Sequence, residues 1–207
     1  MILALLVAAS TPATAIEAER AFAADAQKSG QWTAFRKWAA DDALMFTPQP
    51  VKVHDLLKDS KDPQVSVFWW PGRSYVSCDG KTAVNTGPWV REWGKSVGYF
   101  TTVWQQQPGG GWKWTYDAGD TLQQARAEGG DIKPVIAACP PKDRPVPPPP
   151  QAQMPEGVKY AVGSSADGTL QWMWTVQPDG ERTFRASLWD GTDHRKVIDD
   201  RVAALKP

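Results

Sequence analysis

The chain has 207 residues, of which 42% are hydrophobic and 22% charged, enough for one folded domain with a small second unit. Lys and Arg number 23, as do Asp and Glu, so the formal net charge is zero at pH 7. This balance argues against a nucleic-acid binder and a polybasic membrane-surface protein, because both need a cationic surface. No apolar run approaches the roughly 18 residues that span a bilayer, so we expect no transmembrane segment.

Residues 1–15 have the pattern of a signal peptide. Residues 2–9 are apolar, and Ala13 and Ala15 fit the small-residue pattern before a cleavage site, although no Lys or Arg precedes the apolar stretch. We therefore expect cleavage after Ala15 and a periplasmic or secreted protein. The alternative is a short amphipathic helix that leads into the domain.

The two cysteines are Cys78 and Cys139. In an oxidising compartment they could form a disulfide that ties the end of the first domain to its sheet. The alternative is two separate buried thiols. Two cysteines so far apart in the sequence do not make a zinc motif, and we expect neither a metal site nor a cofactor.

Two helices are predicted near the start of the chain. Residues 16–29 are rich in Ala and charged residues and end at Ser29–Gly30, which is a helix-stop signal. Residues 31–40 carry Trp32, Phe35 and Ala39 at helical spacing. Residues 53–58 are expected to form one further short helical turn.

From residue 64 onward the hydrophobic residues alternate with period two, which predicts strands. We expect strands over residues 64–70, 73–78, 81–86, 98–107 and 111–117. Asp79–Gly80 and residues 108–110 supply the turns of two hairpins. In the last of these strands, strict alternation places Trp112, Trp114 and Tyr116 on one face and Asp117 on the other.

A smaller unit follows a proline-rich linker. We divide the chain into a signal peptide at 1–15, an α+β domain at 16–139, the linker at 140–155 and a β meander at 156–207. The meander is predicted from Asp–Gly turns at 167–168, 179–180 and 190–191, which would connect four antiparallel strands. A sheet this small is marginal alone, so it should dock on the first domain or on a second copy.

A Gly-terminated helix is followed by the segments QWTAF, TGPW, GYFTTVW and GGGWKWTYDAG. In this order, over residues 16–119, they resemble the nuclear transport factor 2-like superfamily and within it the SnoaL-like group. The resemblance implies N-terminal helices packed on a curved, cone-shaped (cystatin-like) antiparallel sheet that leaves a pocket, often in a homodimer. Members include isomerases, cyclases, dehydratases and plain ligand binders, so the fold does not settle the chemistry.

If the sheet is concave, aromatic side chains should line a pocket for a small hydrophobic molecule. The candidate ligand-binding residues are Trp70, Trp89, Phe100, Trp104, Trp114 and Tyr116. The alternative is that these rings form ordinary core, which is the commoner role of Trp at strand spacing.

No established catalytic motif is present, so the catalytic residues stay unassigned. Asp117 and Asp120 lie at and just beyond the end of the last strand of the first domain. A buried Asp there could act as a general base, with Tyr99 or Tyr116 as hydrogen-bond donor to an enolate. The favoured alternative is a strand-end Asp that binds loop amides.

Three functions stay open. The favoured one is an exported, non-catalytic protein that binds a small hydrophobic ligand. A SnoaL-like enzyme with an Asp general base would instead show an aromatic cavity holding a carboxylate with a raised pKa. A glycan- or envelope-binding module would expose a planar row of rings, for example Trp172, Trp174 and Trp189.

Overall fold

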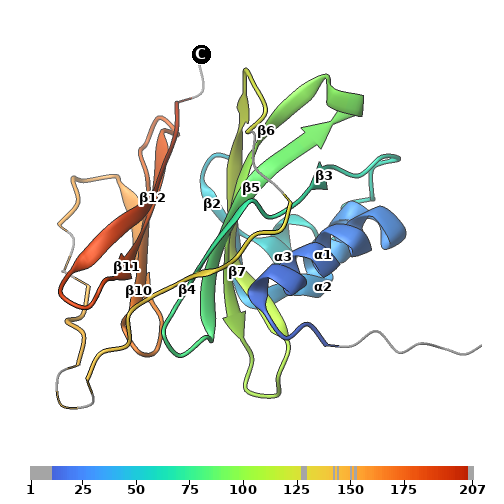
Figure 1. Cartoon of the computed structure of the whole chain (residues 1–207). Helices are drawn as coiled ribbons and strands as arrows, with labels where there is room; N and C mark the ends of the chain where they lie inside the picture. The colour runs from blue at the N-terminus through green and yellow to red at the C-terminus, as the bar shows by residue number, and fades with distance from the viewer. Residues whose placement is uncertain are drawn as a thin grey trace, which may run out of the picture.

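The computed structural model describes residues 11–126, 130–141, 143, 145–149, 151 and 153–204. Most of the predicted signal segment, residues 1–10, lies outside the described residues. The described chain is α+β and has three layers: a helical layer, a large mixed sheet, and a second sheet packed on the other side of the large one (Figure 1).

The helical layer consists of α1 (Ala15–Ser29), α2 (Gln31–Trp38) and α3 (Val53–Leu56). Helix α1 begins at a capping box, in which Thr14 accepts a hydrogen bond from the Glu17 backbone and the Glu17 carboxylate bonds the Thr14 backbone N–H. Gly30, at a φ of 104°, separates α1 from α2. The two predicted helices are confirmed, but α2 ends at Trp38 and the chain turns extended at Ala39.

The large sheet has the order β2-β1-β7-β6-β5-β4-β8, with β3 paired to β5. Its strands are β1 (Ala39–Phe46), β2 (Pro50–Lys52), β3 (Phe68–Trp69), β4 (Arg73–Val76), β5 (Thr82–Arg91), β6 (Ser96–Gln106), β7 (Trp112–Leu122) and β8 (Val135–Ile136).

The prediction of a purely antiparallel sheet is wrong, because β1 runs parallel to β7 and β4 runs parallel to β8. Sequence reasoning also missed β1 and β2 altogether. The strand expected over residues 64–70 is reduced to the two residues of β3, Phe68 and Trp69. A short 3₁₀ turn, η1 (Glu92–Gly94), connects β5 to β6.

The second sheet is the predicted four-stranded meander. It consists of β9 (Lys159–Ser164), β10 (Leu170–Val176), β11 (Arg182–Trp189) and β12 (His194–Val202), all antiparallel in the order β12-β11-β10-β9. It packs on the face of the large sheet that points away from the helices (Figure 1). Tyr75, Val84 and Val103 of the large sheet share one core with Leu170, Trp174, Val176, Phe184 and Leu188 of the second.

The chain between the two sheets is fastened to the large sheet. Residues 130–139, yellow in Figure 1, cross in front of that sheet on their way to the meander. Strand β8 pairs with β4, and three residues later Cys139 forms a disulfide with Cys78, with a Cα–Cα distance of 5.1 Å. The second sheet is therefore attached to the large sheet through β8 and the disulfide as well as through the core that the two sheets share.

Within the described residues, no helix combines the length and apolar character needed to cross a bilayer. The same residues contain no group of three or more His, Cys, Asp or Glu side chains placed to ligate a metal ion.

Candidate functional site

A cavity of about 280 Å³ lies between the helical layer and one end of the large sheet. Helix α2, strands β1, β3, β5, β6 and β7, and the start of β11 all contribute to its wall. Its aromatic lining consists of Trp32, Phe35, Phe46, Trp69, Trp89, Tyr99 and Phe100. Its polar lining includes Gln31, Arg91, Asp117, Asp120 and Arg182.

A β-bulge in β7 decides which side chains of that strand reach the cavity. Trp114 lies opposite Trp104 on β6, whereas Tyr116 lies opposite Val103, so Thr115 is an extra residue in the strand. Bulges of this kind re-aim the side chains that follow them. Trp112 and Trp114 pack in the core on the helix side, and Asp117 comes to line the cavity on that side.

The same bulge turns Tyr116 toward the second sheet. Its ring lies 4.5 Å from that of Phe184 and 5.1 Å from that of Phe46. The prediction that Tyr116 shares a face with Trp112 and Trp114, with Asp117 opposite, is therefore wrong. Strict alternation fails here because it assumes a strand without an inserted residue.

Asp117 is partly buried on the cavity wall. It makes no hydrogen bond or ion pair with another described residue, although Arg182 lines the same cavity. Burial raises the pKa of Asp117 well above its ordinary value, and the negative charge of Glu19 raises it further. The alternative prediction, a strand-end Asp bonded to loop amides, does not describe this side chain.

Glu19 is the carboxylate next to this wall and lies on α1 with 0% of its surface exposed. It accepts hydrogen bonds from Trp69 Nε1 at 2.9 Å, Thr102 Oγ1 at 2.5 Å and Trp104 Nε1 at 2.6 Å, and from Asn85 Nδ2 at 3.3 Å. Burial raises the pKa of Glu19, and the four hydrogen bonds oppose that rise.

Sequence reasoning missed Glu19, although a signal was present. The residue lies on the apolar stripe of α1, three residues after Ile16 and three before Phe22, both of which are buried. A lone carboxylate at such a position must be hydrogen-bonded or neutralised when the helix packs. The four donors come from β3, β5 and β6, which no local pattern could have paired with α1.

Two further polar groups of the cavity come from opposite layers. Gln31 of α2 is buried, and its Oε1 accepts a hydrogen bond from the Val67 backbone N–H at 2.9 Å. Arg182 of β11 donates from Nη2 to the Gly119 carbonyl at 2.9 Å, while its buried Nε has no partner among the described residues. The second sheet thus contributes a cation to the cavity rim.

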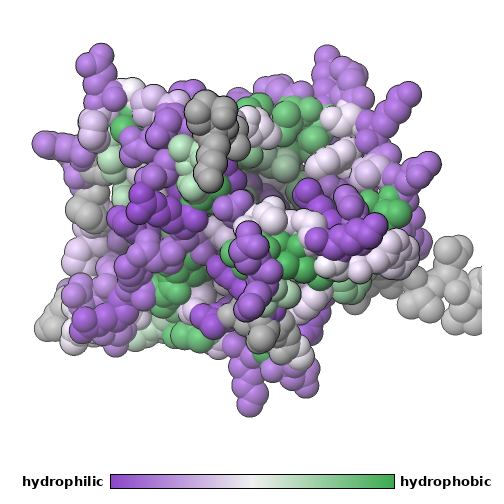
Figure 2. All heavy atoms as spheres, turned by 90° about the horizontal axis from the view of Figure 1, so that it is seen from above, coloured by the Kyte–Doolittle hydropathy of each residue, from purple (hydrophilic) through white to green (hydrophobic). Residues whose placement is uncertain are grey.

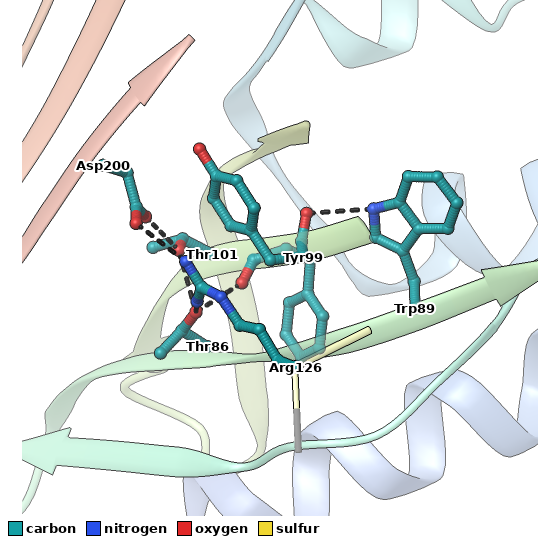
Figure 3. Close-up of polar contacts among 7 residues, drawn as sticks. Thr86, Trp89, Tyr99, Thr101, Arg126 and Asp200 are labelled. Atoms are coloured by element: carbon teal, nitrogen blue, oxygen red, sulfur yellow. Dashed lines mark hydrogen bonds and ion pairs between the residues drawn. The ribbon is translucent and has the colours of Figure 1, made fainter. Parts of the chain in front are cut away.

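The β5–β6 part of the wall is fixed by a polar bridge between the two sheets (Figure 3). Trp89 Nε1 donates to the Tyr99 carbonyl at 2.9 Å. The Arg126 guanidinium lies over the Tyr99 ring, 4.1 Å from its centroid. It donates hydrogen bonds to Thr86 Oγ1 at 3.0 Å and to Asp200 Oδ1 at 3.3 Å. Burial raises the pKa of Asp200 on β12 and also that of the Tyr99 hydroxyl.

The six predicted ligand-binding residues lie in four different places. Trp89 and Phe100 line the cavity. Trp104 and Trp114 are fully buried in the core between helices and sheet, and Tyr116 faces the second sheet. Trp70 is partly exposed and packs on Phe68, with ring centroids 5.6 Å apart, away from the cavity lining.

Comparison with known proteins adds no identification. No protein-family model matches this chain, and no curated protein matches it. The assignment of function therefore depends on the cavity itself.

Proposed function

We propose that this protein is an enzyme that transfers a proton at a carbon next to a carbonyl group of a small, largely apolar substrate. Asp117 is the group that accepts and returns the proton. The observation that carries the proposal is a carboxylate that pairs with no cation among the described residues and lies on the wall of an aromatic-lined cavity, with its pKa raised by burial and by Glu19.

The chemistry follows from what each wall can do. The ionised Asp117 carboxylate removes the α-proton, which leaves an enolate, and the protonated Asp117 then returns the proton to the same or another carbon. A raised pKa brings the strength of this base closer to that needed near neutral pH. The rings of Trp32, Trp89 and Phe100 exclude water and hold a flat substrate.

Gln31 is the candidate donor to the enolate oxygen. Its Oε1 is engaged by Val67, and its NH₂ group makes no hydrogen bond to another described residue. A preorganised N–H donor near a developing oxyanion lowers the barrier without reorganisation of solvent. Of the two tyrosines considered from the sequence, Tyr116 faces the other core, so it does not take this role. Tyr99 lines the cavity, and its ring packs against the Arg126 guanidinium.

The test is α-hydrogen exchange in heavy water, followed by proton NMR on a panel of cyclic and aryl ketones such as cyclohexanone and indanone. We expect the wild-type protein to accelerate exchange of at least one ketone. The isosteric Asp117→Asn variant should lose about 10²-fold or more of that acceleration.

Asp120→Asn is the matched control, because Asp120 lies three residues further along β7, lines the same cavity and bonds the Thr121 backbone N–H at 2.8 Å. This variant should keep most of the activity. Equal loss in both variants, or exchange that survives Asp117→Asn, would contradict the assignment of the proton transfer to Asp117.

Binding of a small hydrophobic ligand without chemistry is the second candidate. The seven aromatic residues of the cavity lining favour it, since such walls bind flat apolar molecules whether or not they react. Ketones that bind to the wild-type protein but show no accelerated exchange would support this function. The glycan proposal gains nothing from Trp172, Trp174 and Trp189, because Trp174 is buried and the other two pack partly buried against the inter-sheet core.

The finer fold and the location of the protein are also proposals. Helices that cover one face of the large sheet above an aromatic-lined cavity support a cone of the nuclear transport factor 2-like type. Export through a signal peptide cut after Ala15 is supported by the apolar stretch of residues 2–9 and by the Cys78–Cys139 disulfide. A homodimer is proposed on the resemblance alone.

A further inference from the structure

The cavity around Asp117 is not the whole of the hollow surface at this end of the molecule. A second hollow of about 430 Å³ lies beside it, between the start of α2, residues 63–67 and the β5–β6 connection. Gln31, Trp32, Val67 and Arg91 line both hollows, so the two are neighbours with a shared wall.

We propose that the two hollows form one binding site for an elongated aryl or cyclic molecule whose side chain ends in a carboxylate. This inference rests on the proposed function, because it places the reacting ring beside Asp117. The side chain then extends past Arg91 into the outer hollow, and the carboxylate lies near Arg91 and Lys95.

The size of the inner cavity supports an elongated ligand. About 280 Å³ is at the lower limit of pockets that hold whole drug-sized molecules, so a ring fits there but a long side chain does not. The outer hollow continues the apolar surface along Trp32, Val67 and Val65. On the face seen in Figure 2, apolar residues reach the surface in separate patches among polar ones, which suits an amphipathic ligand better than a large apolar partner.

Charge sets the direction of the ligand. The inner cavity carries Asp117 and Asp120, which are balanced by Arg182 at its rim and by Arg91 on the wall that it shares with the outer hollow. The outer hollow carries the cations Arg91 and Lys95 against the single anion Glu92. An anionic end group is therefore favoured outside and a neutral ring inside.

Trp93 is the residue that marks the outer hollow as a binding surface. It lines that hollow from η1 and is 92% exposed. Glu92 and Trp93 have positive φ angles of 49° and 59°, an uncommon conformation for residues other than Gly, Asn and Asp. Such strained backbone tends to occur at ligand clamps. The indole offers a flat face to a side chain passing along the groove.

The experiment compares three probes by isothermal titration calorimetry: phenylpropionate, phenyloctanoate and the neutral phenyloctanol. We expect phenyloctanoate to bind the wild-type protein at least about tenfold more tightly than phenylpropionate, because only the longer chain reaches the outer hollow. Trp93→Ala should weaken the binding of phenyloctanoate about fivefold or more. The affinity of this variant for phenylpropionate should stay within about twofold of the wild-type value.

Lys95→Gln should weaken the binding of phenyloctanoate but leave the affinity for phenyloctanol unchanged, because the alcohol carries no charge. Phe68→Ala is the matched control: Phe68 is also an exposed aromatic residue, at 55%, but it lines neither hollow, so the variant should bind all probes like the wild type. Since Trp93 is almost fully exposed, its replacement should not affect folding.

The inference is overturned if phenyloctanoate does not bind, if chain length has no effect, or if Trp93→Ala binds it like the wild type. Indanone exchange separates this outcome from failure of the proposed function. If indanone exchange depends on Asp117 but Trp93→Ala does not change the affinity for phenyloctanoate, only the outer site is rejected. If indanone exchange does not depend on Asp117 but Trp93→Ala weakens the binding of phenyloctanoate, the proton transfer by Asp117 is rejected and the outer site is retained.

Discussion

Two carboxyl groups in one region of the molecule, the fully buried Glu19 and the partly buried Asp117, have different surroundings. Glu19 is bonded by four donors, which stabilise its negative charge in spite of full burial. Asp117 has none among the described residues, so its ionisation is opposed by burial and by Glu19. Burial raises the pKa of both groups, but the charged form of Glu19 has hydrogen-bond donors that the charged form of Asp117 lacks among the described residues.

The folding stability should therefore depend on the ionisation of Asp117. Because its pKa is higher in the folded protein, the folded state binds more protons than the unfolded one between the two pKa values, and stability falls as the pH rises through that window. Asp117→Asn removes this loss. We expect the variant to match the wild type near about pH 4 and to melt a few degrees higher, about 2–4 °C per kcal/mol relieved, near about pH 8.

Thermal unfolding followed by circular dichroism at both pH values tests this prediction. Asp42→Asn, at an exposed position of β1, is the control and should show no such pH-dependent difference. An Asp117→Asn variant that melts below the wild type at about pH 8 would contradict the assigned shift in pKa.

At the level of the strands, the cavity depends on two local irregularities of the β5–β6–β7 segment. The bulge at Thr115 directs Asp117 toward the helices. Gly98 of β6 lies opposite Trp89 of β5, and a Cβ at Gly98 would collide with the Trp89 ring and with the Asp120 carbonyl. The absence of a side chain at Gly98 thus lets the Trp89 indole lie flat on the neighbouring strand as part of the wall.

Gly98→Ala should displace Trp89 and destabilise the fold by about 1–3 kcal/mol through overpacking. Urea unfolding gives this free energy, and ketone exchange should fall at the same time because the wall moves. Gly109→Ala is the control, since no atom of the described residues lies within 4 Å of a Cβ there and its φ is not positive. Equal stability of the two variants would show that Trp89 is free to move aside.

At the level of the whole molecule, the second sheet is an integral layer. Phe184 of β11 is 2% exposed and packs on Tyr116 of the large sheet, and Arg182 of the same strand reaches the cavity rim. Two sheets that share a core should unfold together rather than as two independent domains.

We therefore expect Phe184→Ala to lower the free energy of unfolding by about 3–5 kcal/mol while the protein still unfolds in one transition. Tryptophan fluorescence and far-ultraviolet circular dichroism, followed during urea denaturation, should give the same midpoint. Val162→Ala, at a position of β9 that is 37% exposed, should cost far less. Two separate transitions would show that the meander folds on its own.

Local patterns predicted the elements that local interactions stabilise. Helix α1 has a capping box and a Gly stop, and each turn of the meander has an Asp–Gly pair, so their positions could be found from neighbouring residues. Strand β1 could not, because Ala39–Phe46 follows a helix without a clear alternation and pairs in parallel with β7, far along the chain. The cysteines could be paired only as a hypothesis, since the sequence does not contain their distance.

The sequence by itself determined the fold class, the helices and the hairpins, because period, capping and turn chemistry act over a few residues. Only the tertiary structure decided which rings surround a cavity, that Glu19 is bonded by three strands, and that Asp117 faces the helices rather than the meander. Each of these depends on strand register, and one inserted residue in β7 reverses the direction of every side chain that follows it.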